Sequence, residues 1–352
     1  MHVFEISEPN EGLRTVLRAL KSEGLRQDSR NGPVLRFPRP VCLHYTTPQR
    51  RLVTSPVRDA NPFFHLFETM WMFAGMSEIR PLLTYNPGMA QYSDDGSNLR
   101  GTAYGHRWRN YGSWGDQLYK AADALRANPD DRRVVVTMWD PTELGNSGKD
   151  FACNLQVIFS TRPNPENSGR LLDMTVTNRS NDLIYGALGS NVFHFSMLLE
   201  YMALHTGFQV GAYYQVANNL HLYTENVVAA RCLEYSEEIS NSLSVAGRRD
   251  TALTDFKLTF DPDPIKAYVS NRDLPPQDEY LRKVVAPLVE AYHVFKLKSR
   301  TGIDMDGDTR ISLAQTLAGG CTSQPLAAAC VDWLERRRPK PVSELETELA
   351  HL

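Results

Sequence analysis

The sequence has few cysteines, and no two of them are closely spaced. There are five cysteines in 352 residues, and no Cys-x-x-Cys pair occurs. An odd number at wide spacing argues against a disulfide framework and against a zinc site. We therefore expect no metal and a reducing, cytoplasmic setting.

The sequence also lacks a long apolar run and a large excess of either charge. No apolar run is long enough to cross a bilayer, and the N-terminus has neither a basic n-region nor an apolar h-region. The formal net charge of -3 gives no overall basic field that would hold nucleic acid. We therefore expect neither membrane insertion nor stable nucleic-acid binding.

What is present is an ordinary globular composition, with 42% hydrophobic and 22% charged residues. Residues 22–31 are polar and typical of a loop, and residues 33–45 alternate like a strand whose prolines place it at an edge. The spacing of apolar residues predicts a mixed α+β core. Helices are expected over residues 11–20, 62–73, 114–127, 192–205 and 220–235, and further strands over residues 134–136, 155–160, 171–177, 213–216 and 254–260.

The last part of the chain differs from the rest in composition and in the spacing of its apolar residues. After Asp261 several prolines break the pattern, and residues 280–299 and 313–338 are helical in spacing. We therefore divide the chain into a catalytic domain of residues 1–265 and a C-terminal helical extension of residues 266–352. The extension either binds another protein or caps a dimer. The arginine run at residues 336–338 is interpreted as a solvated helix end.

Several short motifs follow one another in a fixed order, and as an ordered set they resemble the thymidylate synthases and the related pyrimidine-nucleotide hydroxymethylases. The resemblance covers roughly residues 12–230. It implies a mixed sheet flanked by helices and a homodimer formed sheet to sheet. The motifs are Ser29-Arg30-Asn31-Gly32, Glu68-Thr69-Met70-Trp71, Tyr104-Gly105-His106-Arg107-Trp108-Arg109, Asp131-Arg132-Arg133, Phe151-Ala152-Cys153-Asn154, Asn178-Arg179-Ser180-Asn181-Asp182, Gly189-Ser190-Asn191 and His221-Leu222-Tyr223.

Cys153 is the candidate nucleophile. A lone cysteine is more often a buried structural residue. The family's chemistry, however, needs a soft nucleophile that adds to C6 of a pyrimidine ring and turns C5 into an enolate-like carbon. A thiol suits that step, and a nearby guanidinium would lower its pKa. The resemblance puts Arg179 in that place.

Arginines match the family's phosphate clamp. Arginine suits a phosphate because its planar fork makes paired, charge-assisted bonds. In the family, the equivalents of Arg132 and Arg133 reach into the partner's site, although two adjacent arginines are usually a solvated surface pair. The implied clamp for a pyrimidine nucleoside monophosphate consists of Arg30, Arg132, Arg133 and Arg179, with the hydroxyl of Ser180.

Asn191 is the candidate reader of the base. Its amide offers one donor and one acceptor group, which can pair with O4 and N3-H of uracil. Hydroxymethylases that act on cytosine nucleotides carry aspartate at the matching position, so Asn191 favours uracil. The spacing from Asp182 to Asn191 is one residue longer than is usual in the family. Asn191 is equally suited to cap the helix that follows.

The resemblance assigns further roles. His221 and Tyr223 match residues that bind the sugar 3′-hydroxyl, although a lone His-x-Tyr is more often packing. Asp182 matches a carboxylate that contacts the pterin ring of the co-substrate 5,10-methylenetetrahydrofolate. Glu68 matches a carboxylate that organises water and proton transfer, so it is either surface-facing or buried with a raised pKa. Tyr104 matches a tyrosine near the proton that leaves C5.

The product depends on the fate of an exocyclic methylene intermediate that both reactions share. A synthase reduces it with hydride from the folate, whereas a hydroxymethylase lets water add. Three features favour the hydroxymethylase branch, acting on dUMP. Asn154 stands where synthases carry histidine, the tryptophan-bearing loop is absent from residues 83–96, and the tail that ends at residues 348–352 is long. The alternatives are a thymidylate synthase, a dCMP or CMP hydroxymethylase and a non-catalytic nucleotide- or RNA-binding relative.

Overall fold

The central element of the computed structural model is a six-stranded mixed sheet. The structure describes residues 1–145, 147–242, 245–297 and 305–339. The strand order is β1-β4-β9-β7-β6-β5, in which β1 runs parallel to β4 and β7 parallel to β9, and the other pairs are antiparallel. The strands are β1 His2–Ile6, β4 Val41–Tyr45, β5 Val135–Thr137, β6 Asn154–Pro163, β7 Arg170–Asn178 and β9 Gln209–Ala217.

A smaller sheet lies beside the first and has the order β2-β3-β10-β8. Its strands are β2 Leu25–Ser29, β3 Gly32–Arg36, β8 Asn181–Asp182 and β10 Leu220–Tyr223. Strand β8 follows β7 after two residues, and β10 follows β9 in the same way. The ends of β7 and β9 therefore lead directly into the small sheet, where several predicted site residues lie.

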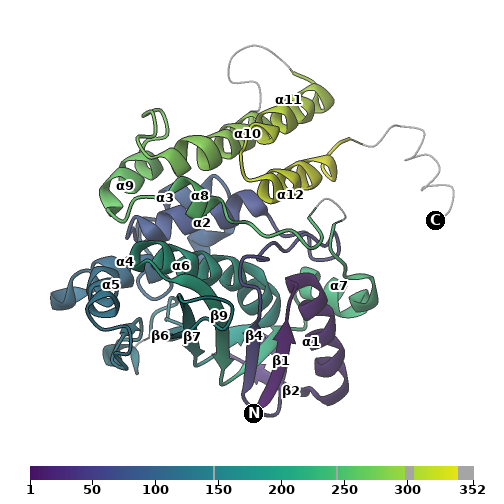
Figure 1. Cartoon of the computed structure of the whole chain (residues 1–352). Helices are drawn as coiled ribbons and strands as arrows, with labels where there is room; N and C mark the ends of the chain where they lie inside the picture. Colours follow the sequence, from purple (N-terminus) through teal and green to yellow (C-terminus); the bar gives the residue numbers. More distant parts are fainter. Residues whose placement is uncertain (146, 243–244, 298–304, 340–352) are drawn as a thin grey trace.

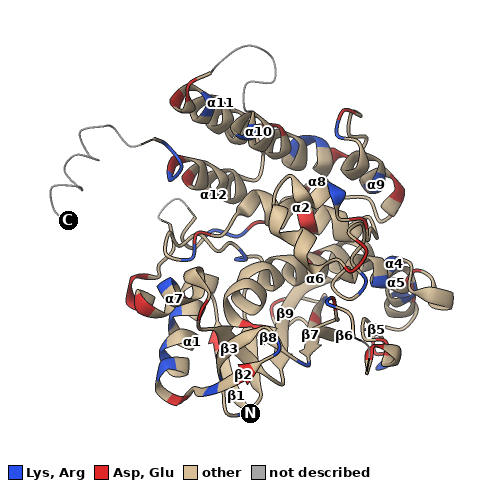
Figure 2. Ribbon diagram, turned by 180° about the vertical axis from the view of Figure 1, so that it is seen from behind, with Lys and Arg blue, Asp and Glu red and all other residues tan. Residues whose placement is uncertain are grey.

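Two apolar helices form the centre of the core. Helix α6, Asn191–Thr206, packs on β9 and β7, and helix α2, Pro62–Phe73, packs on α6. Nearly every side chain of both helices is buried. The Asn61 side chain caps α2 by accepting a hydrogen bond from the Phe64 amide at 3.2 Å, as its sequence predicts. Figure 2 shows charged residues gathered on outer helices such as α1 and α7, whereas α6 is largely uncharged.

The remaining helices surround this core (Figure 1). Helices α9, α10 and α12 pack on the face of α2, so α2 lies between α6 and the C-terminal helices. The ring of Phe63 on α2 lies 5.3 Å from that of Tyr292 and 5.6 Å from that of Trp333. The other helices are α1 Pro9–Glu23, α3 Arg80–Leu83, α4 Tyr104–Arg109, α5 Gln117–Ala127, α7 Val227–Glu234, α8 Ala252–Phe256, α9 Pro262–Ser270, α10 Ala286–Lys296, α11 Gly307–Gly319 and α12 Gln324–Glu335.

Several sequence predictions about single elements are wrong. Residues 25–29 form an exposed edge strand rather than a loop, so their polarity reflects exposure. Residues 33–45 form two strands, β3 and β4, and both are interior. Residues 220–223 are strand rather than helix, because they pair with β3 and β8, and the predicted strand at residues 254–260 begins as the short helix α8. In each case tertiary pairing or packing overrides local propensity.

The division of the chain at residue 265 stays a prediction. The boundary falls inside α9, and the helices after it pack on α2. Part of the expected helix at residues 280–299 and the tail at residues 348–352 lie outside the described residues. The expected helix at residues 313–338 is two helices, α11 and α12.

Candidate active site

A cavity of about 1520 Å³ lies between the small sheet, α2, α6 and the C-terminal helices. Both sheets contribute to its wall, as do the loops that precede α2 and β6. The structure brings together most of the residues that the sequence predicts. Those in the wall are Arg30, Glu68, Tyr104, Cys153, Asp182, Asn191 and Tyr223, whereas Arg132, Arg133, Arg179, Ser180 and His221 are outside it.

Cys153 lies half-buried immediately before β6. Its backbone amide donates to the Tyr104 hydroxyl at 3.1 Å, and the Asn154 amide donates to the same oxygen at 3.3 Å. That oxygen therefore fixes the start of the strand and leaves the hydroxyl proton free to point elsewhere. Burial raises the pKa of Tyr104, so the hydroxyl is protonated at neutral pH.

Arg179 contacts the Cys153 sulfur although its side chain is not part of the cavity wall. Its Nη2 lies 3.8 Å from Sγ, and its Nε donates to the Ala152 carbonyl at 2.8 Å. Burial nevertheless raises the pKa of the Cys153 thiol, and the opposing effects of Arg179 and Arg30 do not outweigh it. Arg179 therefore lowers the pKa of the thiol, as expected, but desolvation is the larger effect and the net shift is upward.

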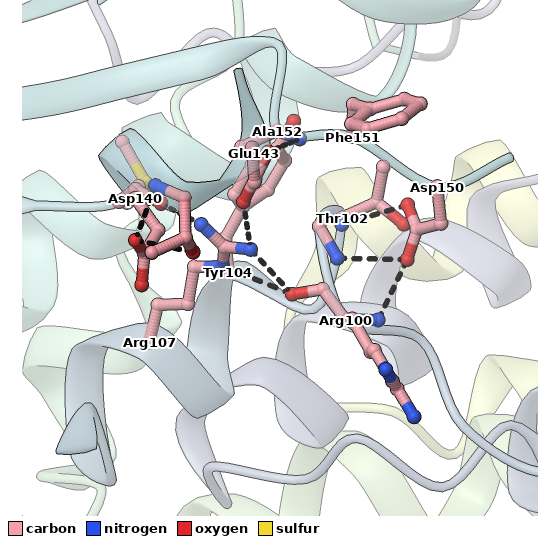
Figure 3. Close-up of polar contacts among 12 residues, drawn as sticks. Arg100, Thr102, Tyr104, Arg107, Asp140, Glu143, Asp150, Phe151 and Ala152 are labelled. Atoms are coloured by element: carbon pink, nitrogen blue, oxygen red, sulfur yellow. Dashed lines mark hydrogen bonds and ion pairs between the residues drawn. The ribbon is translucent and has the colours of Figure 1, made fainter. Parts of the chain in front are cut away.

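A polar network supports the chain just before the nucleophile (Figure 3). The Asp150 carboxylate accepts hydrogen bonds from the amides of Arg100, Gly101 and Thr102 at 2.7–2.9 Å. Glu143 accepts a bond from the Ala152 amide at 3.0 Å and pairs with the buried Arg107. These bonds tie the segment ahead of Cys153 to two other loops, so they hold the thiol in place.

The segment between Asp182 and Asn191, which is one residue longer than is usual in the family, forms a π-helix at Leu183–Ser190 with non-helical backbone angles at Leu188 and Gly189. A π-turn holds one more residue than an α-turn. Two glycines permit this path, because a Cβ at Gly186 would collide with Asn181 Oδ1 and one at Gly189 with the Ile184 carbonyl. Asn191 therefore still faces the cavity, where its Nδ2 donates to Asn181 Oδ1 at 3.2 Å. The N-cap residue of helix α6 is Ser190 and not Asn191, and Ser190 makes no side-chain cap bond.

Glu68 is buried on α2 rather than surface-facing, and it meets a histidine that the sequence reasoning missed. His194 Nε2 lies 3.2 Å from Glu68 Oε2, and both side chains line the cavity. A second histidine, His65, lies one turn before Glu68 with its ring centroid 6.1 Å from that of His194. Burial, with the neighbouring His194 and Arg58, keeps the pKa of His65 well below its usual value.

Asp182 and His221 face each other across strands β8 and β10, where they are register partners. Burial raises the pKa of Asp182 and lowers that of His221, while each partner opposes the shift of the other. One Asp182 oxygen caps the π-helix by accepting from the Ile184 amide at 2.8 Å. The other oxygen, Oδ2, is buried and has no partner among the described residues, so it can accept a bond from a ligand.

Among the other arginines, Arg30 acts on the thiol through its charge, which lowers the pKa of Cys153 against the larger, raising effect of burial. Arg30 donates to the carbonyls of Gly148 and Lys149 at 3.2 and 3.3 Å, at the mouth of the cavity. Arg132 and Arg133 are exposed beside the edge strand β5, and Arg133 pairs with Asp131 at 2.8 Å. They stay outside the cavity of their own chain.

The wall opposite the small sheet is aromatic and was not predicted. Its C-terminal members come from α10 and α12, and the cations Lys296 and Arg337 lie at the ends of those helices. Aromatic residues at helical spacing are normally read as core, so the sequence carried no separate signal for this wall. The aromatic members are Phe64, Tyr85, Tyr292, Phe295 and Trp333.

Two kinds of feature are absent from the described parts of the chain. Within them no helix is long and apolar enough to cross a membrane. The same residues contain no group of three or more His, Cys, Asp or Glu side chains that could hold a metal ion.

Comparison with known proteins gives consistent matches. A family model described as thymidylate synthase matches residues 15–271. The chain is 38% identical to a deoxyuridylate hydroxymethyltransferase of Pseudomonas phage M6, over 96% of this chain and 95% of the relative. It is 35% identical to the protein of the same name from Bacillus phage SP01, over 77% and 71%. A thymidylate synthase of Streptococcus suis is 29% identical over 44% of this chain and 54% of the relative.

Proposed function

The chain belongs to the thymidylate synthase family, and from that premise we propose that it transfers a one-carbon unit from a folate to C5 of dUMP and releases 5-hydroxymethyl-dUMP. The observation that carries this proposal is one cavity whose wall contains Cys153, Asn191 and Glu68. A nucleophile, a base-reading amide and a buried carboxylate are the groups that this reaction requires.

In the proposed mechanism, Cys153 adds through its sulfur to C6 of the uracil. Because burial keeps the thiol protonated in the free protein, its proton has to leave when the nucleotide binds. Arg179, 3.8 Å from the sulfur, stabilises the thiolate that forms. Arg179, Arg30 and Ser180 are proposed to bind the phosphate, and His221 and Tyr223 the sugar hydroxyl.

Uracil is favoured over cytosine by the hydrogen bonds of Asn191. Its Nδ2 uses one hydrogen for Asn181 Oδ1 and keeps a second for O4 of the base. Its own Oδ1 then accepts from N3-H. Cytosine offers a 4-amino group and an unprotonated N3. The donor Nδ2 of Asn191 would then face a donor, and its acceptor Oδ1 would face an acceptor, so neither hydrogen bond could form.

The co-substrate is proposed to be methylene-tetrahydrofolate. The residues present fit such a molecule, because the free Asp182 Oδ2 can accept from a pterin N-H and the aromatic wall can stack on flat rings. The folate supplies the one-carbon unit. The chain's own residues bind and orient it, and Tyr104 is proposed to assist the loss of the C5 proton.

Hydroxymethylation rather than methylation is supported by Asn154 and by the relatives' names. Asn154 is buried, and its side chain pairs with Asn178, so no imidazole follows the nucleophile. Residues 83–96, where the tryptophan-bearing loop of the synthases is not recognisable, contribute Tyr85 and Tyr92 to the cavity wall.

A homodimer formed sheet to sheet is part of the proposal. The six-stranded sheet has α6 on one face, and side chains such as His44, Ile158 and Tyr214 on its strands keep partial exposure. A partner on that face would bring its own Arg132 and Arg133 toward this chain's nucleotide. We further propose a reducing, cytoplasmic setting, in agreement with five unpaired cysteines.

The test is mass spectrometry of the nucleotide product. Wild type and Cys153→Ala are offered dUMP, dCMP, UMP and CMP with methylene-tetrahydrofolate. A gain of one CH2O unit on dUMP, absent in the variant, is expected. A gain of CH2 would identify a thymidylate synthase, and reaction on dCMP alone would overturn the role of Asn191.

A further inference from the structure

His194 has a position that a packing role does not explain. His194 is 2% exposed and lines the cavity, and its Nε2, a buried atom with no hydrogen-bond partner among the described residues, lies 3.2 Å from Glu68 Oε2. A carboxylate beside an imidazole orients the ring. The pair therefore has the arrangement of a general base with its orienting partner.

The position of His194 on α6 relates it to the reacting carbon. His194 follows Asn191 by three residues, so the two side chains share one face of the helix. If Asn191 reads O4 of the uracil, His194 lies one turn further along that face. C5, which carries the transferred carbon, is bonded to C4, so the exocyclic carbon lies close to the O4 edge.

The hydroxymethyl route needs a base at this point. Water is a poor nucleophile, and it must lose a proton as its oxygen adds to the exocyclic methylene carbon. The imidazole that synthases carry after the nucleophile is replaced here by Asn154, whose side chain is occupied by Asn178. Among the described residues of the wall, His194 is the imidazole held by a carboxylate.

We propose that His194, oriented by Glu68, is the general base that activates the water in the hydroxymethylation step, an inference that rests on the proposed function. His194 takes one proton from water while the oxygen forms a bond to the methylene carbon. The electron pair of the C=C bond moves through C5 to the O4 enolate. The enolate then reforms the C5=C6 double bond and expels the Cys153 sulfur, which regains a proton from the imidazolium.

His65 provides a matched control in the same cavity. It is also a buried imidazole, but burial and nearby positive charge hold its pKa low, and it is not an ion-pair partner of Glu68. His65→Gln should change the rates of all chemical steps together. His194→Gln keeps a hydrogen-bonding group beside Glu68 but has no basic nitrogen, so it should slow only the addition of water.

The experiment uses dUMP that carries tritium at C5, with methylene-tetrahydrofolate and the whole protein. In wild type, tritium release and hydroxymethyl product should rise together. In His194→Gln, tritium release should show a burst equal to the number of active sites, while product forms about 10²–10³-fold more slowly. An added thiol should react with the accumulated exocyclic methylene intermediate and give a thioether.

The outcomes separate the two hypotheses. If tritium release and product fall in parallel in His194→Gln, His194 acts earlier or only in packing, and the base assignment is wrong. If wild type releases a methylated nucleotide, the proposed function fails instead. Should His194→Gln fold poorly, His194→Ala with free imidazole gives a second test, because imidazole should restore product formation without changing the burst.

Discussion

The two ends of the cavity are built in different ways. The nucleotide end, around Cys153 and Asn191, lies within the part of the chain that the family model matches and is held by directional hydrogen bonds. The opposite wall consists of packed aromatic rings, and its members from α10 and α12, with the cations Lys296 and Arg337, lie beyond residue 271.

This difference predicts how substitutions at each end affect the enzyme. Directional bonds fix atoms to a few tenths of an ångström, as reaction at C5 and C6 requires. Stacked rings hold a flat ligand without specifying each atom, so that wall can differ among relatives. We therefore expect substitutions at the first end to change the rate of chemistry, and substitutions at the second end to change mainly the affinity for the folate.

The largest effect is expected for Arg179→Gln, which tests whether one cation serves both the sulfur and the phosphate. Removal of the charge 3.8 Å from Sγ should raise the Cys153 pKa further and lower kcat/KM by roughly 10²–10³-fold. Alkylation of the thiol, followed against pH, measures the first effect, and steady-state kinetics the second.

Arg30→Gln is the control for that prediction, because Arg30 is held by carbonyls at the mouth. It should raise the KM for dUMP with a much smaller change in the pH dependence of alkylation. Equal pH shifts in both variants would mean that the thiol responds to the overall potential of the cavity and not to the contact with Arg179.

A stability effect is expected for Glu143→Gln, in the network behind the nucleophile. The side chains of Glu143 and Arg107 are 10% and 7% exposed, and the substitution leaves a buried guanidinium without its counter-charge. The free energy of unfolding should fall by about 3 kcal/mol, as measured by urea denaturation. Asp123→Asn, at an exposed ion pair with Arg126, should cost less than about 1 kcal/mol.

The same contrast explains what could be predicted from the sequence. The nucleotide end was predicted because its groups occur in short motifs, and the structure brings Cys153, Glu68, Asp182 and Asn191 into one wall. The role of each group stays a prediction. His194 was not found, since a histidine within an apolar helix carries no motif and its meaning depends on Glu68, 126 positions earlier.

The sequence predicted secondary structure correctly where hydrophobic periodicity and helix caps agreed. It failed where pairing with a distant strand determined the conformation. Helices α2 and α6 and the neighbouring strands β6 and β7 follow from local pattern. Strand β10 does not, because residues distant in sequence make it a strand. Arg336 is exposed, as expected of a solvated helix end, but both Arg336 and Arg337 pair with Asp59, and nothing in the sequence indicates this partner because it lies 277 and 278 positions earlier.

A smaller effect is expected for Lys296→Gln at the aromatic end. Lys296 lies in the cavity wall, with Nζ 5.5 Å from the centre of the Phe295 ring. If this rim attracts the carboxylates of a folate, the KM for methylene-tetrahydrofolate should rise by about fivefold while the KM for dUMP stays constant. Lys283→Gln, a lysine outside the cavity wall, is the matched control and should change neither constant. A rise in both KM values for Lys296→Gln would show that the two ends are not independent.

The smallest effect is expected for Asp59→Asn, which tests how the C-terminal helices are fastened to the core. Asp59 pairs with Arg337 at 2.9 Å and Arg336 at 3.1 Å. Burial alone would raise the pKa of Asp59, but the two arginines lower it overall. Its φ of 50° suits asparagine as well, so the backbone conformation should persist.

A depressed pKa in the folded state stabilises the protein above the pKa of the unfolded chain, about 4 for aspartate, and that stability disappears as the pH falls through the folded value. Wild type should therefore exceed Asp59→Asn by about 1 kcal/mol in urea denaturation at pH 7, and the two should converge as the pH falls below about 4. A difference that stays constant with pH would mean that Asp59 acts through backbone shape. Convergence would mean that charge fastens the aromatic wall to the loop before α2, so the wall should loosen in acid while the hydrogen-bonded nucleotide end persists.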